Sequence, residues 1–145
     1  MKESQLFALL EEGRKNNNIY LVARAALLLR GIGVPNCLTA DEKNLILYRL
    51  QCAREGKGTL GLEPGYELAR WILICRYIFP EKYIVPSLDD IRMIQEACDS
   101  YCKDRILKQV ASLVHMQGLL NIPLSINRLP PKKRKYVMKL AAALK

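Results

Sequence analysis

The residues best suited to chemistry in this sequence gather near its C-terminus, where basic side chains follow one another directly. Four consecutive cations occupy positions 132 to 135, with Pro131 before them and Tyr136 after them. Neighbouring cations repel one another unless an anionic surface neutralises them. A phosphate backbone and an acidic protein groove both provide such a surface, so the run predicts an anion-binding role.

The distribution of charge along the chain supports the same segment. The protein has 145 residues and a formal net charge of +9, and the segment from Arg128 to Lys145 contains seven basic residues and no acidic one. Residues 1–127 therefore carry only +2. We expect contacts with nucleic acid from the basic side chains and from an aromatic ring that can stack on an exposed base. The candidate residues are Arg128, Lys132, Lys133, Arg134, Lys135, Tyr136 and Lys139, with Lys103, Arg105 and Lys108 as extensions.

The stretch PKKRKYV at positions 131–137 resembles the monopartite nuclear localisation signal, a short Lys/Arg run behind a proline. The resemblance implies an import receptor as a partner. A plain solvated helix turn is the third interpretation, although cations at a helix N-terminus oppose the helix dipole. No ribonucleoprotein signature, GXXG clamp or basic zipper is present, so sequence-specific recognition is not predicted. No known family has motifs that match residues 1–127.

Catalytic and metal sites have little support in the sequence. His115 is the single histidine, and no nucleophile, base and orienting group can be assembled around it. Cys98, Cys102 and His115 have the spacing of three zinc-finger ligands, but no fourth ligand follows. The sequence GKGT at positions 56–59 departs from the Walker phosphate-binding pattern. We therefore expect no enzyme, no metal and no cofactor.

Several features predict an intracellular protein, in the nucleus, the cytoplasm or both. The five cysteines are an odd number without disulfide-framework spacing, which favours reduced thiols. The N-terminus has no apolar segment typical of a signal peptide. The longest apolar stretch, Tyr20–Leu29, is interrupted by Arg24 and is far shorter than the roughly 20 residues needed to cross a bilayer. No membrane association is expected.

Helical periodicity and capping signals run through nearly the whole chain, and no strand pattern occurs. The fold class is therefore predicted as all-α, a single-domain bundle of five to six helices. Residues 1–127 form the helical core domain, and residues 128–145 form a basic C-terminal helix or tail that packs on this core or extends from it. Trp71 is expected in the core. The predicted helices span about 4–15, 19–30, 40–55, 65–78, 88–116 and 132–144, with an extended strap at 119–129 before the last.

These observations predict a non-enzymatic accessory protein, viral or cellular, that binds RNA or DNA through its basic C-terminal segment and that can form a homo-oligomer. The alternative is a helical protein–protein adaptor whose basic run is an import signal or binds an acidic partner. Nucleic-acid binding predicts that cations from several helices converge on one face. An adaptor predicts an exposed apolar patch or groove away from the tail.

Overall fold

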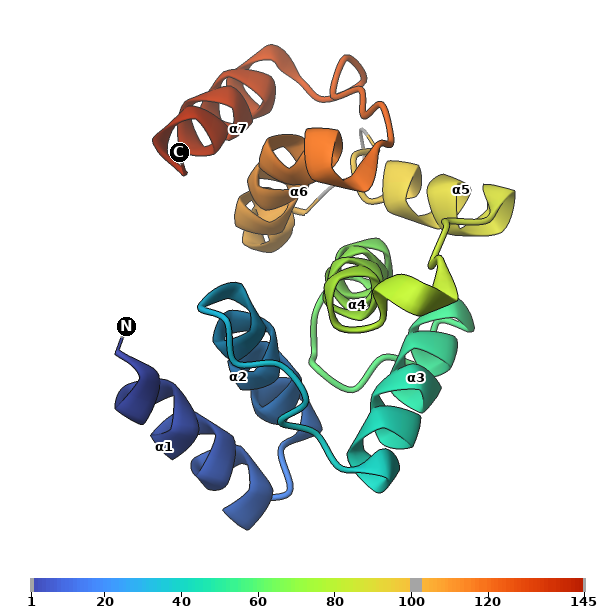
Figure 1. Ribbon diagram of the computed structural model, residues 1–145. Coiled ribbons are helices and arrows are strands. Elements are labelled where there is room, and N and C mark those ends of the chain that lie inside the picture. Colours follow the sequence, from blue (N-terminus) through green and yellow to red (C-terminus); the bar gives the residue numbers. More distant parts are fainter. Residues whose placement is uncertain (1, 100–102, 145) are drawn as a thin grey trace. The chain divides into compact units, whose positions relative to one another are not determined.

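The computed structural model describes residues 2–99 and 103–144, and helices account for most of them (Figure 1). The described residues form seven α-helices and no strand, which confirms the all-α class. None of these helices is long and apolar enough to span a membrane. The helices are α1 (Glu3–Lys15), α2 (Ile19–Gly31), α3 (Ala40–Arg54), α4 (Pro64–Ile78), α5 (Leu88–Glu96), α6 (Leu107–Leu120) and α7 (Pro131–Ala143), with two short 3-10 helices, η1 (Pro80–Lys82) and η2 (Asp104–Ile106).

The single long helix predicted between positions 88 and 116 is wrong. Helix α5 ends at Glu96, a turn follows, and α6 begins only at Leu107, directly after η2. Buried side chains in α5 and in the segment after it, such as Ile94, Cys98 and Ile106, happen to keep helical spacing. Apolar spacing shows which side chains are buried and does not show that the backbone continues as a helix between them. The number of helices therefore exceeds the predicted five to six.

The predicted strap is present but shorter than expected. Helix α6 continues through Leu120 and ends at Asn121, whose φ of 58° places it in the left-handed conformation that often ends helices. Residues 122–130 then lead to α7 without a helix. We call this segment the strap. Its side chains Ile122, Ile126 and Leu129 are buried, so apolar contacts hold it to the fold.

Contacts within the chain divide it into two compact units. Unit 1 comprises Met1–Gln51 and Ile74–Ile84, and unit 2 comprises Cys52–Leu73 and Val85–Lys145. The boundaries pass through α3 and α4, so each of these helices contributes residues to both units. The basic C-terminal segment belongs to unit 2.

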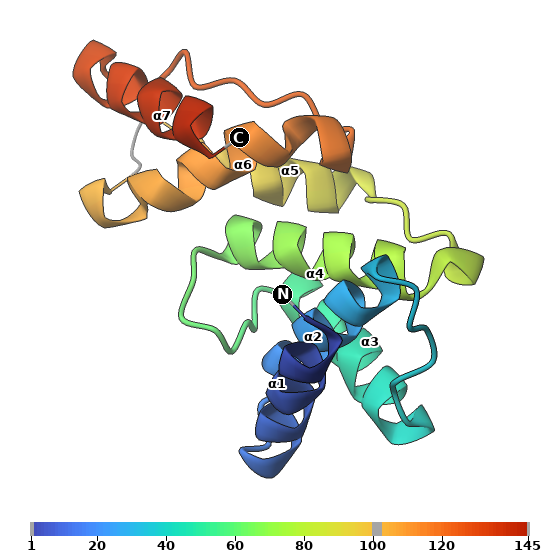
Figure 2. The same cartoon turned by 60° about the vertical axis from the view of Figure 1, so that its left-hand side comes forward.

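Unit 1 is built on a hairpin of α1 and α2, which lie side by side in both ribbon views (Figures 1 and 2). The turn between them ends at Asn18, whose side chain accepts a hydrogen bond from the Leu21 amide and caps α2. Gly13 allows the close approach, because a Cβ there would lie 2.8 Å from Cγ2 of Val22. The hairpin core contains Leu6, Leu10, Val22, Ala25 and Leu29.

A charged contact joins the end of α1 to the start of α3 in unit 1. Glu42 forms a capping box with Thr39, since its carboxylate accepts from the Thr39 amide at 2.9 Å and its amide donates to Oγ1 of Thr39 at 3.1 Å. The same carboxylate accepts from Nε and Nη2 of Arg14 at 2.8 and 2.9 Å. Arg14 also donates to the Cys37 carbonyl at 2.7 Å. These hydrogen bonds from Arg14 are the main reason that the pKa of Glu42 lies below its ordinary value.

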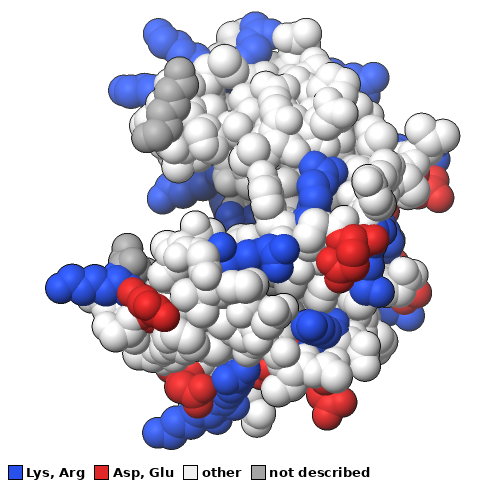
Figure 3. Space-filling model, in the orientation of Figure 1, with Lys and Arg blue, Asp and Glu red and all other residues white. Residues whose placement is uncertain are grey.

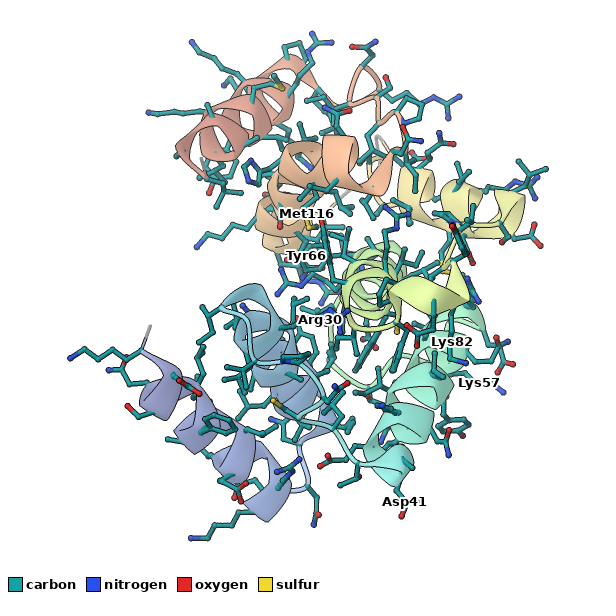
Figure 4. All side chains as sticks on the ribbon, viewed as in Figure 1. Arg30, Asp41, Lys57, Tyr66, Lys82 and Met116 are labelled. Atoms are coloured by element: carbon teal, nitrogen blue, oxygen red, sulfur yellow. The ribbon has the colours of Figure 1, made fainter. Side chains whose placement is uncertain are left out.

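Unit 2 contains a close helix contact between α4 and α5. A Cβ at Gly65 of α4 would collide with the carbonyl oxygen of Met93 on α5, and it would lie 3.1 Å from atoms of Ile94 and Ala97. On its other side α4 carries Tyr66, which is labelled in Figure 4. The Tyr66 hydroxyl donates to Oγ of Ser112 on α6 at 3.2 Å. Helix α4 is thus held on two sides within this unit.

Glu67 fixes the glycine-rich loop that precedes α4. Its carboxylate is buried and accepts hydrogen bonds from the amides of Thr59 and Leu60, both at 3.0 Å. The indole Nε1 of Trp71, which is fully buried as predicted, donates to it at 3.4 Å. Gly58 lies directly against the carboxylate, and a Cβ there would overlap it. The lack of a side chain at Gly58 therefore leaves room for the buried carboxylate.

A second buried acid of unit 2 joins the end of α3 to the start of α5. Asp90 forms a capping box with Ser87, each side chain accepting from the backbone amide of the other. The Asp90 carboxylate is only 3 % exposed and also accepts from Nε of Arg54 at 3.1 Å.

Glu42 should make the free energy of unfolding decrease at acidic pH. A carboxyl with a lowered folded-state pKa stabilises the fold fully above its unfolded pKa of about 4.3, and this stabilisation is lost as pH falls through the folded pKa. We expect Glu42→Gln to lower the free energy of unfolding at neutral pH and to flatten its decrease below about pH 4.3. Urea unfolding followed by circular dichroism measures both effects. Glu12→Gln on the exposed side of α1 is the control, and equal behaviour of the two variants would contradict the assignment.

Two helical glycines should respond oppositely to replacement by alanine, because only one of them lies at the close contact between α4 and α5. Gly65→Ala forces a methyl group against α5 and should destabilise the protein by about 1–3 kcal/mol. Gly118→Ala on α6 meets open space and should stabilise it by up to about 1 kcal/mol. The fluorescence of Trp71, the single tryptophan, reports unfolding of unit 2 in urea. Equal effects of the two variants would refute the close contact.

Candidate nucleic-acid interface

The predicted basic run lies in helix α7, which the local sequence favours. Pro131 occupies the first helical position, where its missing amide donor costs nothing, and good helix formers such as Lys, Met, Leu and Ala follow. The helix packs against α6 and buries Val137 and Ala141. Successive residues of an α-helix are rotated by about 100°. Consecutive cations in α7 therefore cannot all point in one direction.

Three lysines and one tyrosine share the side of α7 that faces solvent. Lys132, Lys135 and Lys139 have the helical spacing i, i+3, i+7, and Tyr136 lies between them at i+4. All four side chains are exposed, and Val137 and Ala141 point the other way. We call Lys132, Lys135, Tyr136 and Lys139 the lysine face.

The other two cations of the run contact residues of other segments of the protein. Lys133 is half-buried, and its Nζ forms an ion pair with Oδ1 of Asp104 at 3.2 Å. Arg134 is also half-buried, and its Nη1 donates to the carbonyl of Asn127 in the strap at 3.5 Å. The structure thus separates the predicted run into an exposed set and a set that helps to hold α7 in place.

Cations from other elements lie near the start of α7. The ion pair between Lys133 and Asp104 places η2 beside the first turn of α7, and the residues on either side of Asp104, namely Lys103 and Arg105, are exposed. Lys108 is exposed one residue into α6. Arg128 in the strap is 80 % exposed, with its Nη1 4.0 Å from Oδ2 of Asp99.

The charges visible on this part of the surface are mostly of one sign. Figure 3 shows Lys and Arg side chains projecting from the surface formed by α7 and the strap, with no Asp or Glu among them in that view. The segment 128–145 contains no acidic residue at all. The side chains project in several directions, so only the helical register of the lysine face gathers cations into one row.

The lysine face can bind successive anionic groups without reading a sequence. Lys132 and Lys139 are separated by about 10 Å along the helix axis, at about 1.5 Å per residue. Lysine ammonium groups on flexible stems contact phosphate as point charges rather than in a fixed geometry. Lys132 also lies at the positive end of the α7 dipole, an unfavourable position that a bound anion would relieve.

Grooves away from the lysine face occur in both units. In unit 2, a groove of about 360 Å³ runs between α5 and the strap and is lined by acids as well as arginines, among them Arg92, Glu96, Asp99 and Arg128. In unit 1, a more apolar groove of about 280 Å³ is lined by Ile19, Val22 and Leu45 beside the Arg14–Glu42 pair.

Among the described residues, no three His, Cys, Asp or Glu side chains are grouped to hold a metal ion. Cys102, which the zinc-finger spacing includes, lies outside the described residues. Cys98 is buried, and His115 is exposed on α6. The structure gives neither of these two residues a place in the lysine face.

Sequence reasoning identified every member of the lysine face but not the division within the run. The signal that could have shown this division is helical spacing, which places Lys132, Lys135, Tyr136 and Lys139 on one side of α7 once its buried side is known. Nothing in the sequence pointed to Asp104 or Asn127 as partners of the remaining two cations. No protein-family model, curated protein or solved structure matches this chain.

Proposed function

We propose that this protein is a non-enzymatic nucleic-acid-binding protein that contacts phosphates through the lysine face of α7. The observation that carries the proposal is the alignment of Lys132, Lys135 and Lys139 on the solvent side of one helix, in a segment without an acidic residue. Further exposed cations in the strap, in η2 and at the start of α6 support it. Arg128, Lys103, Arg105 and Lys108 extend the contact surface.

The helical register favours this proposal over an import signal read as a continuous run. A receptor that binds all four consecutive cations needs them on one side, whereas α7 directs Lys133 and Arg134 toward Asp104 and Asn127. Binding as an import signal would therefore require the start of α7 to unfold. Phosphate contacts through the lysine face require no such change.

A protein–protein adaptor is the second candidate, and the groove of unit 1 favours it. The lining of this groove includes the apolar side chains of Ile19, Val22 and Leu45, and the groove lies in the unit that does not contain α7. Under that proposal the basic segment would bind an acidic protein, so polyglutamate should compete as well as nucleic acid does. Nucleic-acid binding predicts weak competition by polyglutamate at equal charge concentration.

Removing the lysine face should weaken nucleic-acid binding and its salt dependence. Each lysine that neutralises a phosphate releases counterions and adds about 0.7 to 0.9 to the steepness of log Kobs against log salt. The triple variant Lys132→Gln, Lys135→Gln and Lys139→Gln should therefore reduce that slope by about 2 to 3. We expect affinity to fall about tenfold or more at low salt. Fluorescence anisotropy with labelled RNA and DNA across a salt series measures both quantities.

A matched triple variant separates a local surface from net charge alone. Lys15, Lys57 and Lys82 are exposed and lie outside the basic segment, so their replacement by Gln removes the same charge. This control should keep most of the affinity and the slope. Equal losses in the two triple variants, with both still folded by circular dichroism, would refute the proposal, and so would the absence of binding by the natural protein at low salt.

A further inference from the structure

Tyr136 occupies the centre of the lysine face. Its neighbours on the helix surface, at i−4 and i+3, are Lys132 and Lys139. Side chains on a helix lean toward the N-terminus, so the tyrosine ring covers the turn that carries Lys132. The side chain is 43 % exposed and faces solvent, while Val137 beside it is buried.

The surroundings of Tyr136 distinguish it from another exposed tyrosine. Tyr77 on α4 has a similar exposure of 48 %. The residues of α4 at i−4 and i−3 from it are Leu73 and Ile74, so no lysine stands beside it on the helix. Exposure alone therefore does not distinguish Tyr136. Tyr136 differs because its accessible ring has an ammonium group on each side along the helix.

An aromatic ring between two cations suits a single strand better than a duplex. In a duplex the faces of the bases are covered by their neighbours, so a side chain that touches phosphates cannot reach them. In a single strand the bases can turn outward and stack on an aromatic side chain while lysines contact the adjacent phosphates. The row from Lys132 to Lys139 is about 10 Å long, enough for about two or three phosphates of one strand.

We infer that the lysine face binds single-stranded nucleic acid, with one base stacked on Tyr136 and the flanking phosphates contacted by Lys132 and Lys139. This inference rests on the proposed function and specifies its ligand. It requires no recognition of base edges, since every base has a face that can stack. Binding should therefore be tolerant of sequence and should favour single strands over duplexes of equal phosphate number.

The test uses the full-length protein with three probes of equal phosphate number: an oligothymidylate, a hairpin duplex and an abasic oligomer that keeps the phosphates but lacks bases. Tyr136→Leu should weaken binding of oligothymidylate about tenfold and leave binding of the duplex and the abasic oligomer unchanged. Tyr136→Phe keeps the ring and should bind as the natural protein does. Tyr77→Leu is the matched control for loss of an exposed tyrosine.

Three results would overturn the inference while leaving the phosphate contacts standing. They are equal or tighter binding of the duplex, no effect of Tyr136→Leu on oligothymidylate, and an equal effect of Tyr136→Leu on the abasic oligomer. In each case the salt slope of the natural protein, and its decrease in the triple lysine variant, would still support the proposed function. No binding of any probe by the natural protein would instead refute the proposed function, and the inference with it.

Discussion

The folding of unit 2 depends on two buried carboxylates. A buried carboxylate must be neutralised by hydrogen bonds or an opposite charge, because an unpaired one would cost several kcal/mol. Glu67 is satisfied by two loop amides and the Trp71 indole. Asp90 is satisfied by the Ser87 amide and by Arg54. The contact between Arg54 and Asp90 joins residues 36 positions apart, so the end of α3 and the start of α5 must take their places together. The contacts of Glu67 are local and hold the glycine-rich loop against α4. Helix α6 can then pack through Ser112 against Tyr66.

The use of acids in the interior of the fold bears on the charge of the surface. The carboxylates of Glu42, Glu67 and Asp90 accept hydrogen bonds from backbone amides or arginines of the fold. Their negative charge is therefore neutralised by contacts within the protein. The segment after Arg128 has no acid of its own, and the exposed Asp104 of η2 neutralises Lys133. Among the described residues, no acidic side chain pairs with the lysines of the lysine face, so their positive charge is not compensated there. That excess is the physical basis of the proposed binding of phosphates and of a single strand.

Local signals made much of the fold predictable. The caps formed by Thr39 with Glu42 and by Ser87 with Asp90 depend on side chains three residues apart, so they can be recognised without knowledge of the tertiary structure. The burial of Trp71 also followed from its place in an apolar helix. The continuous helix predicted through position 116 failed because apolar spacing persists across the turn after Glu96. The second contacts of Glu42 and Asp90, with Arg14 and Arg54, join residues 28 and 36 positions apart, and no local pattern indicates them.

The sequence by itself determined the all-α class, the basic C-terminal helix and the identity of its cations and tyrosine, because composition, capping and helical propensity act over a few residues. Only the tertiary structure decided which of those cations face solvent. Burial of Val137 and Ala141 against α6 sets the rotation of α7 about its axis. Asp104 and Asn127 then engage Lys133 and Arg134, and Lys132, Lys135, Tyr136 and Lys139 are left outside. That rotation depends on contacts between segments distant in sequence, which the order of residues in α7 does not specify.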